Sequence, residues 1–249
     1  MDELKGKVAI VTGASKGIGS AIARQFATEG AAVVVNYASS KEDADRVVGD
    51  ILREGGKAMA IQANVSKGAD VKRLFAETKA TFGIPSILVN NAGVYSCAPL
   101  AEVTEAEFHR HFDTNVLSTI LTTREAAAAF GKDGGSVINF STISSTNPVS
   151  NSVIYSASKS AVDAVTKALA SELAGRKIRV NAIAPGMTVT EGLAAVFGIE
   201  GEAARDIGAT LPMGRLGQPE DVARVALFLA SDQSAWVTGE RITVSGGQR

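Results

Sequence analysis

The stretch VAIVTGASKGIGSAIARQFA, residues 8–27, decides the fold of this chain. Its first five residues are apolar or β-branched, as is typical of a buried strand, and the Ala-rich pattern from residue 17 is typical of an amphipathic helix. Gly13, Gly17 and Gly19 lie where the strand passes into the helix. Glycine lets the backbone approach a ligand, and a helix N-terminus attracts anions, so this loop predicts a diphosphate site.

The alternation of strand and helix continues along the chain. Short β-branched runs predict seven strands, at residues 8–12, 32–36, 58–62, 86–90, 136–140, 178–183 and 241–244. Longer amphipathic runs predict helices near residues 17–29, 40–54, 67–82, 104–130, 153–174 and 219–230. This rhythm implies right-handed crossovers and helices on both faces of the sheet. We therefore expect an α/β fold, a single-domain Rossmann-type doubly wound sheet of seven mostly parallel strands that spans residues 1–249.

One interval, residues 186–212, is too long for an ordinary connection, and we expect it to form a substrate lid. It is apolar at Leu193, Val196, Phe197 and Ile199. These side chains indicate either a hydrophobic substrate or packing of the lid onto the body of the protein.

Composition excludes several classes of function. A formal net charge of -1 gives no support for binding nucleic acid or an anionic membrane through bulk charge. Cys97 is the only cysteine, which excludes an intrachain disulfide and a cysteine-built zinc site and suits a reducing cytosol. The N-terminal run MDELKGKVAIVTG begins acidic and soon meets a glycine. We therefore expect neither a signal peptide nor a membrane anchor, and a cytoplasmic location.

The end of the second predicted strand bears on which dinucleotide is bound. An NAD enzyme of this architecture usually has Asp or Glu here, which binds the ribose hydroxyls and repels a 2′-phosphate. This chain instead has Asn36 and Tyr37, followed by Ala38, Ser39, Ser40 and Lys41, and Lys16 of the glycine loop can approach the same corner. The missing acid and the two cations favour NADP(H), with NAD(H) as the alternative.

A polar run, STISSTNPVSNSVIYSASK at residues 141–159, follows the fifth predicted strand, at the edge where open α/β sheets bind ligands. The helix at its end carries Tyr155 and Lys159 one turn apart on one face. An ammonium held there is expected to lower the pKa of the phenol from its usual value of about 10. Tyr155 would then serve as a general acid for reducing a ketone near neutral pH, although a lone Tyr-x-x-x-Lys spacing also arises by chance.

Five motifs together resemble the short-chain dehydrogenase/reductases. They are TGASKGIG at 12–19, NNAG at 90–93, the Asn of TNVLS at 114–118, YSASK at 155–159 and APG at 184–186, in that family's order and spacing. Chain length and glycine spacing are similar to its compact oxidoreductase branch, which includes 3-oxoacyl-(acyl carrier protein) reductases and glucose 1-dehydrogenases.

The resemblance implies a role for each matching position. Tyr155 would protonate the developing alkoxide, Lys159 would hold the nicotinamide ribose and depress the Tyr155 pKa, and Asn115 would anchor a water that links Lys159 to solvent. Asn91, Ala92 and Gly93 would line the cofactor beneath the fourth strand, and Pro185, Gly186, Thr188 and Thr190 would hold its carboxamide end. The remaining cofactor positions are Gly13, Ser15, Lys16, Gly17, Ile18, Gly19, Asn36, Tyr37, Ala38, Ser39, Asn64 and Val65. No metal ion is needed.

The family's catalytic serine, thirteen residues before the tyrosine, is replaced by Thr142. Its hydroxyl can still donate to a carbonyl oxygen, but its methyl group restricts χ1 and takes room beside the reacting carbon. Ser141 should point to the opposite face if strand alternation continues, and Ser144 lies two residues further along. We expect Thr142 to take the role, with Ser144 and then neither residue as the alternatives.

Two further departures are smaller. Asn64 stands where the family usually has an adenine-binding Asp, and its amide oxygen can still accept from an adenine amino group. Ser245 stands where the last strand commonly has Asp, which puts local contacts near the C-terminus in doubt.

Together the motifs predict NADPH-dependent reduction of a ketone or 3-oxoacyl-type carbonyl, with Tyr155 as general acid/base. The alternatives are an NAD(P)-dependent sugar or polyol dehydrogenase and, from another class, a protein that senses NADP(H) without turnover. The expected partner is a small molecule. The resemblance also implies a homotetramer that uses the helices at 104–130 and 153–174.

Overall fold

The computed structural model describes residues 2–198 and 201–248, and its centre is one parallel sheet. Seven strands lie in the order β3-β2-β1-β4-β5-β6-β7, and every pairing is parallel. They are β1 Val8–Val11, β2 Ala32–Tyr37, β3 Lys57–Gln62, β4 Ile87–Asn90, β5 Gly135–Phe140, β6 Ile178–Pro185 and β7 Arg241–Val244. The predicted Rossmann-type sheet is confirmed, and the order reverses between β1 and β4, where such sheets bind ligands.

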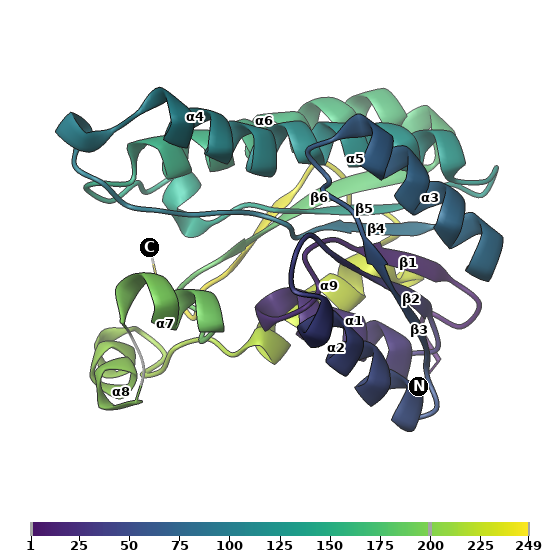
Figure 1. Cartoon of the computed structure of the whole chain (residues 1–249), viewed down its shortest axis with the longest axis horizontal. Helices are drawn as coiled ribbons and strands as arrows, with labels where there is room; N and C mark the ends of the chain where they lie inside the picture. The colour runs from purple at the N-terminus through teal and green to yellow at the C-terminus, as the bar shows by residue number, and fades with distance from the viewer. Residues whose placement is uncertain (1, 199–200, 249) are drawn as a thin grey trace.

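Helices cover both faces of this sheet, as Figure 1 shows. One layer consists of α1 Gly17–Thr28, α2 Lys41–Arg53 and α9 Pro219–Ala230, and the other of α3 Gly68–Phe82, α4 Glu105–His111, α5 Ser118–Ala129 and α6 Val153–Leu173. Each layer encloses its own apolar core. In β1, Ala9 and Val11 belong to one core and Ile10 to the other, because successive side chains of a strand point to opposite faces.

The predicted helix at 104–130 is interrupted. Between α4 and α5 the chain forms a π-helical segment, Phe112–Leu117, that contains the buried Asn115. Such a segment inserts an extra residue into the helical turn and is frequent at functional sites. The apolar periodicity continues through it, which is why the sequence predicts one helix.

The interval expected to be a lid holds two helices, α7 Glu191–Phe197 and α8 Gly201–Thr210, which lie beyond the sheet in Figure 1. A bridge between Thr188 and Gly217 closes the base of this excursion. Leu193 is buried, as packing of the lid onto the body requires. Ile199 and the side chains of Val196 and Phe197 lie outside the described residues, so the question about their role stays open. In the described ranges, no helix has the length and apolar character needed to cross a membrane.

Candidate active site

The glycine loop between β1 and α1 can take its shape because its glycines have no side chains. Gly13 and Gly17 have φ of 60° and 56°, a left-handed conformation that favours glycine. A Cβ on Gly13 would lie 2.9 Å from the Cα of Ala92, and one on Gly19 would lie 2.5 Å from the Nδ2 of Asn91. The loop therefore fits closely against the chain that follows β4.

Thr12 and Asn91 tie these two segments together. The Oγ1 of Thr12 accepts hydrogen bonds from the backbone N–H groups of Asn91 and Ala92, each at 3.0 Å. The Nδ2 of Asn91 donates to the carbonyls of Thr12 and Gly13, at 2.9 and 3.0 Å. Of the residues expected to line the cofactor, Asn91 thus uses its side chain to shape the loop, and the resulting backbone cradle at a helix N-terminus fits the diphosphate of a dinucleotide.

Asn36, at the end of β2, has a structural task as well. Its side chain is buried, its Oδ1 accepts from the N–H of Gly13, and its Nδ2 donates to the carbonyls of Ile61 and Ala63. The side chain of Asn36 thus shapes the glycine loop from the end of β2, and its place among the cofactor-binding residues stays a prediction. Ala38, Ser39 and Lys16 are exposed and Ser15 and Ser40 half-buried, so they remain available at this corner, whereas Tyr37 is buried.

Asn64 is also engaged within the chain. Its Oδ1 accepts from the N–H and the hydroxyl of Ser66, at 3.1 and 2.7 Å. These two bonds use both lone pairs of the amide oxygen, so the acceptor expected to bind an adenine amino group is occupied. Val65, beside it, is buried.

Thr142, Tyr155 and Lys159 meet at the carboxyl end of β5. The hydroxyl of Thr142 donates a hydrogen bond to the phenol oxygen of Tyr155 and accepts from the N–H of Ser144 at 3.4 Å. Ser141 points elsewhere, with its hydroxyl 3.2 Å from that of Ser145, as strand alternation predicts. The structure therefore brings Thr142, and not Ser141, to the tyrosine.

Burial dominates the electrostatics of this cluster. It raises the pKa of Tyr155 to about 12, against a smaller opposing effect of the hydrogen bond from Thr142. It also lowers the pKa of Lys159 to about 8. The expectation of a lowered pKa at Tyr155 is wrong in this structure, because desolvation raises that pKa and Lys159 is not among the groups that shift it. The Nζ of Lys159 donates instead to the carbonyl of Phe140, at 2.7 Å.

Asn115 lies beside this cluster. Its side chain makes a reciprocal pair with the backbone of Val94, accepting at 2.8 Å and donating at 3.0 Å, and it donates to the hydroxyl of Ser158. A Cβ on Gly93 would lie 3.1 Å from the Oδ1 of Asn115 and 3.4 Å from the Nζ of Lys159. The missing side chain at Gly93 therefore keeps open the space around both residues.

The segment after β6 reaches the glycine loop. Thr190 caps α7 by accepting from the N–H of Leu193, and its Cγ2 would lie 3.3 Å from a Cβ on Gly17. Thr188 is buried and donates to the carbonyl of Gly186. Thr190 therefore joins the base of the lid to the helix N-terminus expected to hold the diphosphate. Further on, the hydroxyl of Ser245 donates to the carbonyl of Gln248, at 2.9 Å.

Four residues around Thr142, Tyr155 and Lys159 were not found by sequence reasoning: Tyr95 and His111 beside Tyr155, Arg241 at Thr142 and Asp163 near Lys159. The rings of Tyr95 and His111 lie with centroids 5.9 and 6.4 Å from that of Tyr155. A Cβ on Gly192 of α7 would lie 3.0 Å from the hydroxyl of Tyr95, so Tyr95 spans from the cluster to the lid. Asp163 alone had a signal in the sequence, since it continues the i, i+4 spacing of Tyr155 and Lys159.

The fold and this cluster define a class, the NAD(P)-dependent oxidoreductases that act between an alcohol and a carbonyl. A family model described as enoyl-(acyl carrier protein) reductase matches residues 13–249. An uncharacterized oxidoreductase of Methylorubrum extorquens is 51% identical over 100% of both chains. The 3beta-hydroxysteroid dehydrogenase 1 of Eggerthella lenta is 44% identical, over 99% of this chain and 95% of its own length.

Solved structures agree with these relatives. A short-chain dehydrogenase/reductase of Serratia marcescens has 35% identity and a TM-score of 0.90, over 98% of each chain. The chain described above belongs to the short-chain dehydrogenase/reductase family.

Proposed function

We propose that the protein reduces a ketone or 3-oxoacyl-type carbonyl to an alcohol with NADPH. The observation that carries this is the arrangement at the carboxyl end of β5, where the half-buried Tyr155 is hydrogen-bonded by Thr142 and Lys159 follows one turn later on α6. A phenol keeps its proton at neutral pH, so Tyr155 is placed to give a proton to the oxygen on which charge develops during reduction.

A bound nicotinamide cofactor supplies the hydride, and the chain's own residues do the rest. The hydroxyls of Thr142 and Tyr155 hold the carbonyl oxygen and stabilise the charge that develops on it. Tyr155 gives its proton to that oxygen. Lys159 holds the ribose hydroxyls, and Asn115 supports the path by which the proton is replaced.

NADPH is the proposed cofactor, and NADH is the alternative. Neither the last residues of β2 nor residues 38–41 include a carboxylate, and Ser39 and Lys16 are exposed at the corner where a 2′-phosphate would lie. Lys41 contributes less than its charge implies, because its ammonium is bonded to Asp45.

Names of similar proteins narrow the substrate. The Eggerthella lenta relative is a hydroxysteroid dehydrogenase, and one of Aspergillus parasiticus, 42% identical, is versicolorin reductase 1. Others are hydroxynaphthalene reductase-like. Aromatic rings of Tyr95 and His111 beside Tyr155 support a flat cyclic ketone as the first substrate class to test.

The test is consumption of NADPH and NADH, side by side, with one ketone from each class: a steroid, a fused-ring aromatic ketone, a 3-oxoacyl thioester and an oxidised sugar. Reduction of the cyclic ketones or the thioester with NADPH supports the proposal. Preferential oxidation of polyols would favour the dehydrogenase alternative, and NADPH binding without turnover of any substrate would favour a sensor.

A homotetramer in the cytoplasm completes the proposal. The helices expected to meet in an assembly carry exposed apolar residues, which are Phe108 of α4, Leu117 at the end of the π-helical segment, Ile120 of α5 and Val153 of α6. Sedimentation of the purified protein tests this, and a monomer at micromolar concentration would reject it.

A further inference from the structure

We propose that Arg241 and Asp163 are positioning residues that hold the hydroxyl of Thr142 against Tyr155. The inference rests on the proposed function, in which Thr142 binds the substrate carbonyl. It concerns an ion pair that reaches from β7 and α6 to the segment after β5.

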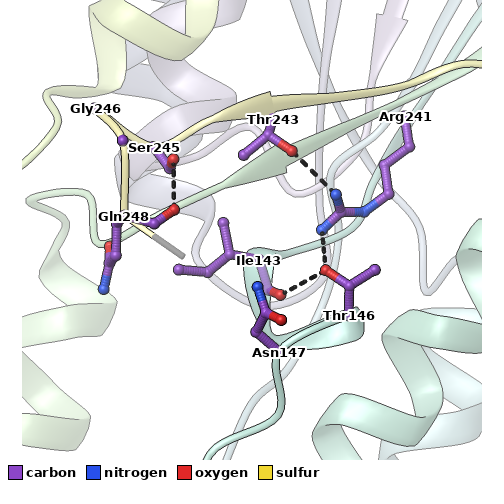
Figure 2. A pocket seen from close by; sticks show the side chains of 9 residues that line it. Ile143, Thr146, Asn147, Arg241, Thr243, Ser245, Gly246 and Gln248 are labelled. Atoms are coloured by element: carbon purple, nitrogen blue, oxygen red, sulfur yellow. Dashed lines mark hydrogen bonds between the residues drawn. The ribbon is translucent and has the colours of Figure 1, made fainter.

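Arg241 crosses from the edge strand to the main chain of Thr142. Its Nη2 donates to the carbonyl of Thr142 at 2.7 Å, and its Nη1 donates to Thr243 at 3.0 Å. Figure 2 shows the guanidinium between Thr243 and Thr146. A planar guanidinium with several donors fixes the direction of each bond, so Thr142 is held by its backbone while its side chain faces the tyrosine.

Ser145 connects the same carbonyl to Asp163. Its hydroxyl lies 2.9 Å from the carbonyl oxygen of Thr142 and 2.6 Å from the Oδ2 of Asp163. The Nε of Arg241 lies 3.2 Å from that same Oδ2. The Nε of Arg241 also donates to the hydroxyl oxygen of Ser145 at 3.2 Å, so the hydroxyl accepts from Arg241 while its single proton goes to the carbonyl of Thr142 or to Asp163.

The ion pair is largely shielded from water, which strengthens the electrostatic attraction between its two charges. The side chains of Arg241 and Asp163 are 17% and 13% exposed. Removing one partner of such a pair leaves the other charge buried without compensation. The Oδ1 of Asp163 is buried and without a hydrogen-bond partner in the described chain, so the Arg241 side is where this carboxylate is held.

Asp163 also faces Lys159, one turn earlier on α6. Its charge raises the pKa of Lys159 against the larger lowering effect of burial. The ion pair therefore acts on both neighbours of Tyr155. Arg241 holds the main chain of Thr142 by a hydrogen bond, and the charge of Asp163 acts electrostatically on the ammonium of Lys159.

A shorter side chain at position 241 would not leave a closed cavity in the protein. It borders a cavity of about 480 Å³ that Ile143, Asn147 and Gln248 also line, drawn in Figure 2. Water can therefore replace the lost part of a shortened side chain, and a folded variant is expected.

The first experiment compares Arg241→Gln with Arg241→Lys. Arg241→Gln is expected to lower kcat about 10- to 100-fold, since small displacements of a positioning group have effects of this size. NADPH affinity should stay unchanged, because Arg241 lies outside the glycine loop. Arg241→Lys keeps a charge for Asp163 and should recover part of kcat, which a loss of packing alone would not predict.

The second experiment is a double-mutant cycle. If Arg241 acts through Thr142, adding Arg241→Gln to Thr142→Ala should cause no further loss of kcat. Multiplied losses in the double variant would overturn the inference. Arg179→Gln is the matched control. Arg179 lies at the start of β6 and also donates to a hydroxyl, that of Ser234, and to a carbonyl, that of Ser231. Its kcat should equal that of the parent.

Failure of the inference and of the proposed function can be told apart. A Tyr155→Phe variant that still reduces ketones rejects the function. An inactive Tyr155→Phe and an impaired Thr142→Ala, with a parental kcat in Arg241→Gln, reject the positioning role alone. If Arg241→Gln does not fold, Ser145→Ala tests the same connection, with a smaller expected loss of kcat and the same absence of loss in the Thr142→Ala background.

Discussion

The glycine loop and the catalytic face of α6 are built in opposite ways. Around Gly13 and Gly19 the shape comes from missing side chains, because any Cβ would strike the chain after β4. Around Tyr155 and Lys159 it comes from large polar side chains, a half-buried phenol and a buried ammonium, whose pKa values desolvation shifts. The first region is limited by steric fit, and the second by desolvation.

Because of this difference, substitutions in the two regions should affect different properties of the protein. A steric change in the glycine loop should weaken cofactor binding and leave the chemistry of bound substrate intact. A change at Tyr155 of α6 should alter turnover and leave cofactor affinity almost intact, and a change at Lys159 should also alter the pH dependence of stability. The variants below test that separation.

The largest effect is expected for Tyr155→Phe. Loss of the proton donor should lower kcat by about 10²- to 10⁴-fold, the usual contribution of general acid catalysis. The dissociation constant for NADPH, measured by fluorescence titration, should change little. A variant with weak NADPH binding and a normal kcat would contradict the proposed division between the two regions.

Lys159→Met should make the protein inactive and more stable. The pKa of Lys159 falls from 10.5 to about 8 on folding. At pH 7 this burial costs about 3 kcal/mol, and the lost hydrogen bond to Phe140 offsets about 1 kcal/mol of the gain. Urea denaturation should show the variant to be about 2 kcal/mol more stable.

The pH dependence provides the control. Between about 8 and 10 the unfolded chain keeps the Lys159 proton that the folded chain has lost, so the parent's free energy of unfolding rises with pH. Above about 10 the raised pKa of Tyr155 acts in the opposite direction. The Met variant should lack the rise between 8 and 10, and its persistence there would show that another group causes it.

Gly19→Ala tests the steric region. The added Cβ would lie 2.5 Å from the Nδ2 of Asn91 and 2.7 Å from the carbonyl oxygen of Gly13, so the loop must shift. NADPH affinity should fall by at least about tenfold, which corresponds to about 1.4 kcal/mol. With saturating NADPH, kcat should approach that of the parent.

Gly49→Ala is the matched control for that variant. Gly49 lies inside α2 and has nothing within 4 Å of an added Cβ. Alanine is favoured over glycine in a helix interior by about 1 kcal/mol, so this variant should be slightly more stable and bind NADPH normally. Equal losses of affinity in both variants would show that the effect of Gly19→Ala is not local.

The sequence predicts the sheet and the two regions well, because each depends on signals close together in the chain. Glycines between a strand and a helix, and a Tyr and Lys one turn apart, are local patterns. All seven strands are confirmed, with bounds that differ by one or two residues at their ends.

What the sequence does not predict depends on contacts between distant segments. Arg241 reaches Thr142 across 99 positions of the chain, and no local pattern marks it. The π-helical turn at Asn115 keeps the apolar periodicity of a helix. The side chain of Asn36 is turned inward by the carbonyls of Ile61 and Ala63, which only the fold brings near.

The smallest effect is expected where the 2′-phosphate of NADPH would lie, near the end of β2. There the cofactor region depends on the side chain of Lys16, and not on the missing side chains that shape the rest of the glycine loop. Lys16 is exposed in the glycine loop, and Lys41 is paired with Asp45. Lys16→Gln should raise the KM for NADPH about threefold, as expected of one solvent-screened charge, and leave the KM for NADH unchanged. Lys41→Gln should have a still smaller effect, since Asp45 already neutralises that ammonium. If both variants change the KM for NADPH and the KM for NADH by the same factor, neither lysine contacts the 2′-phosphate. Selectivity between the two cofactors would then depend on Ser39 and the backbone, as the fit of the rest of the glycine loop depends on its shape.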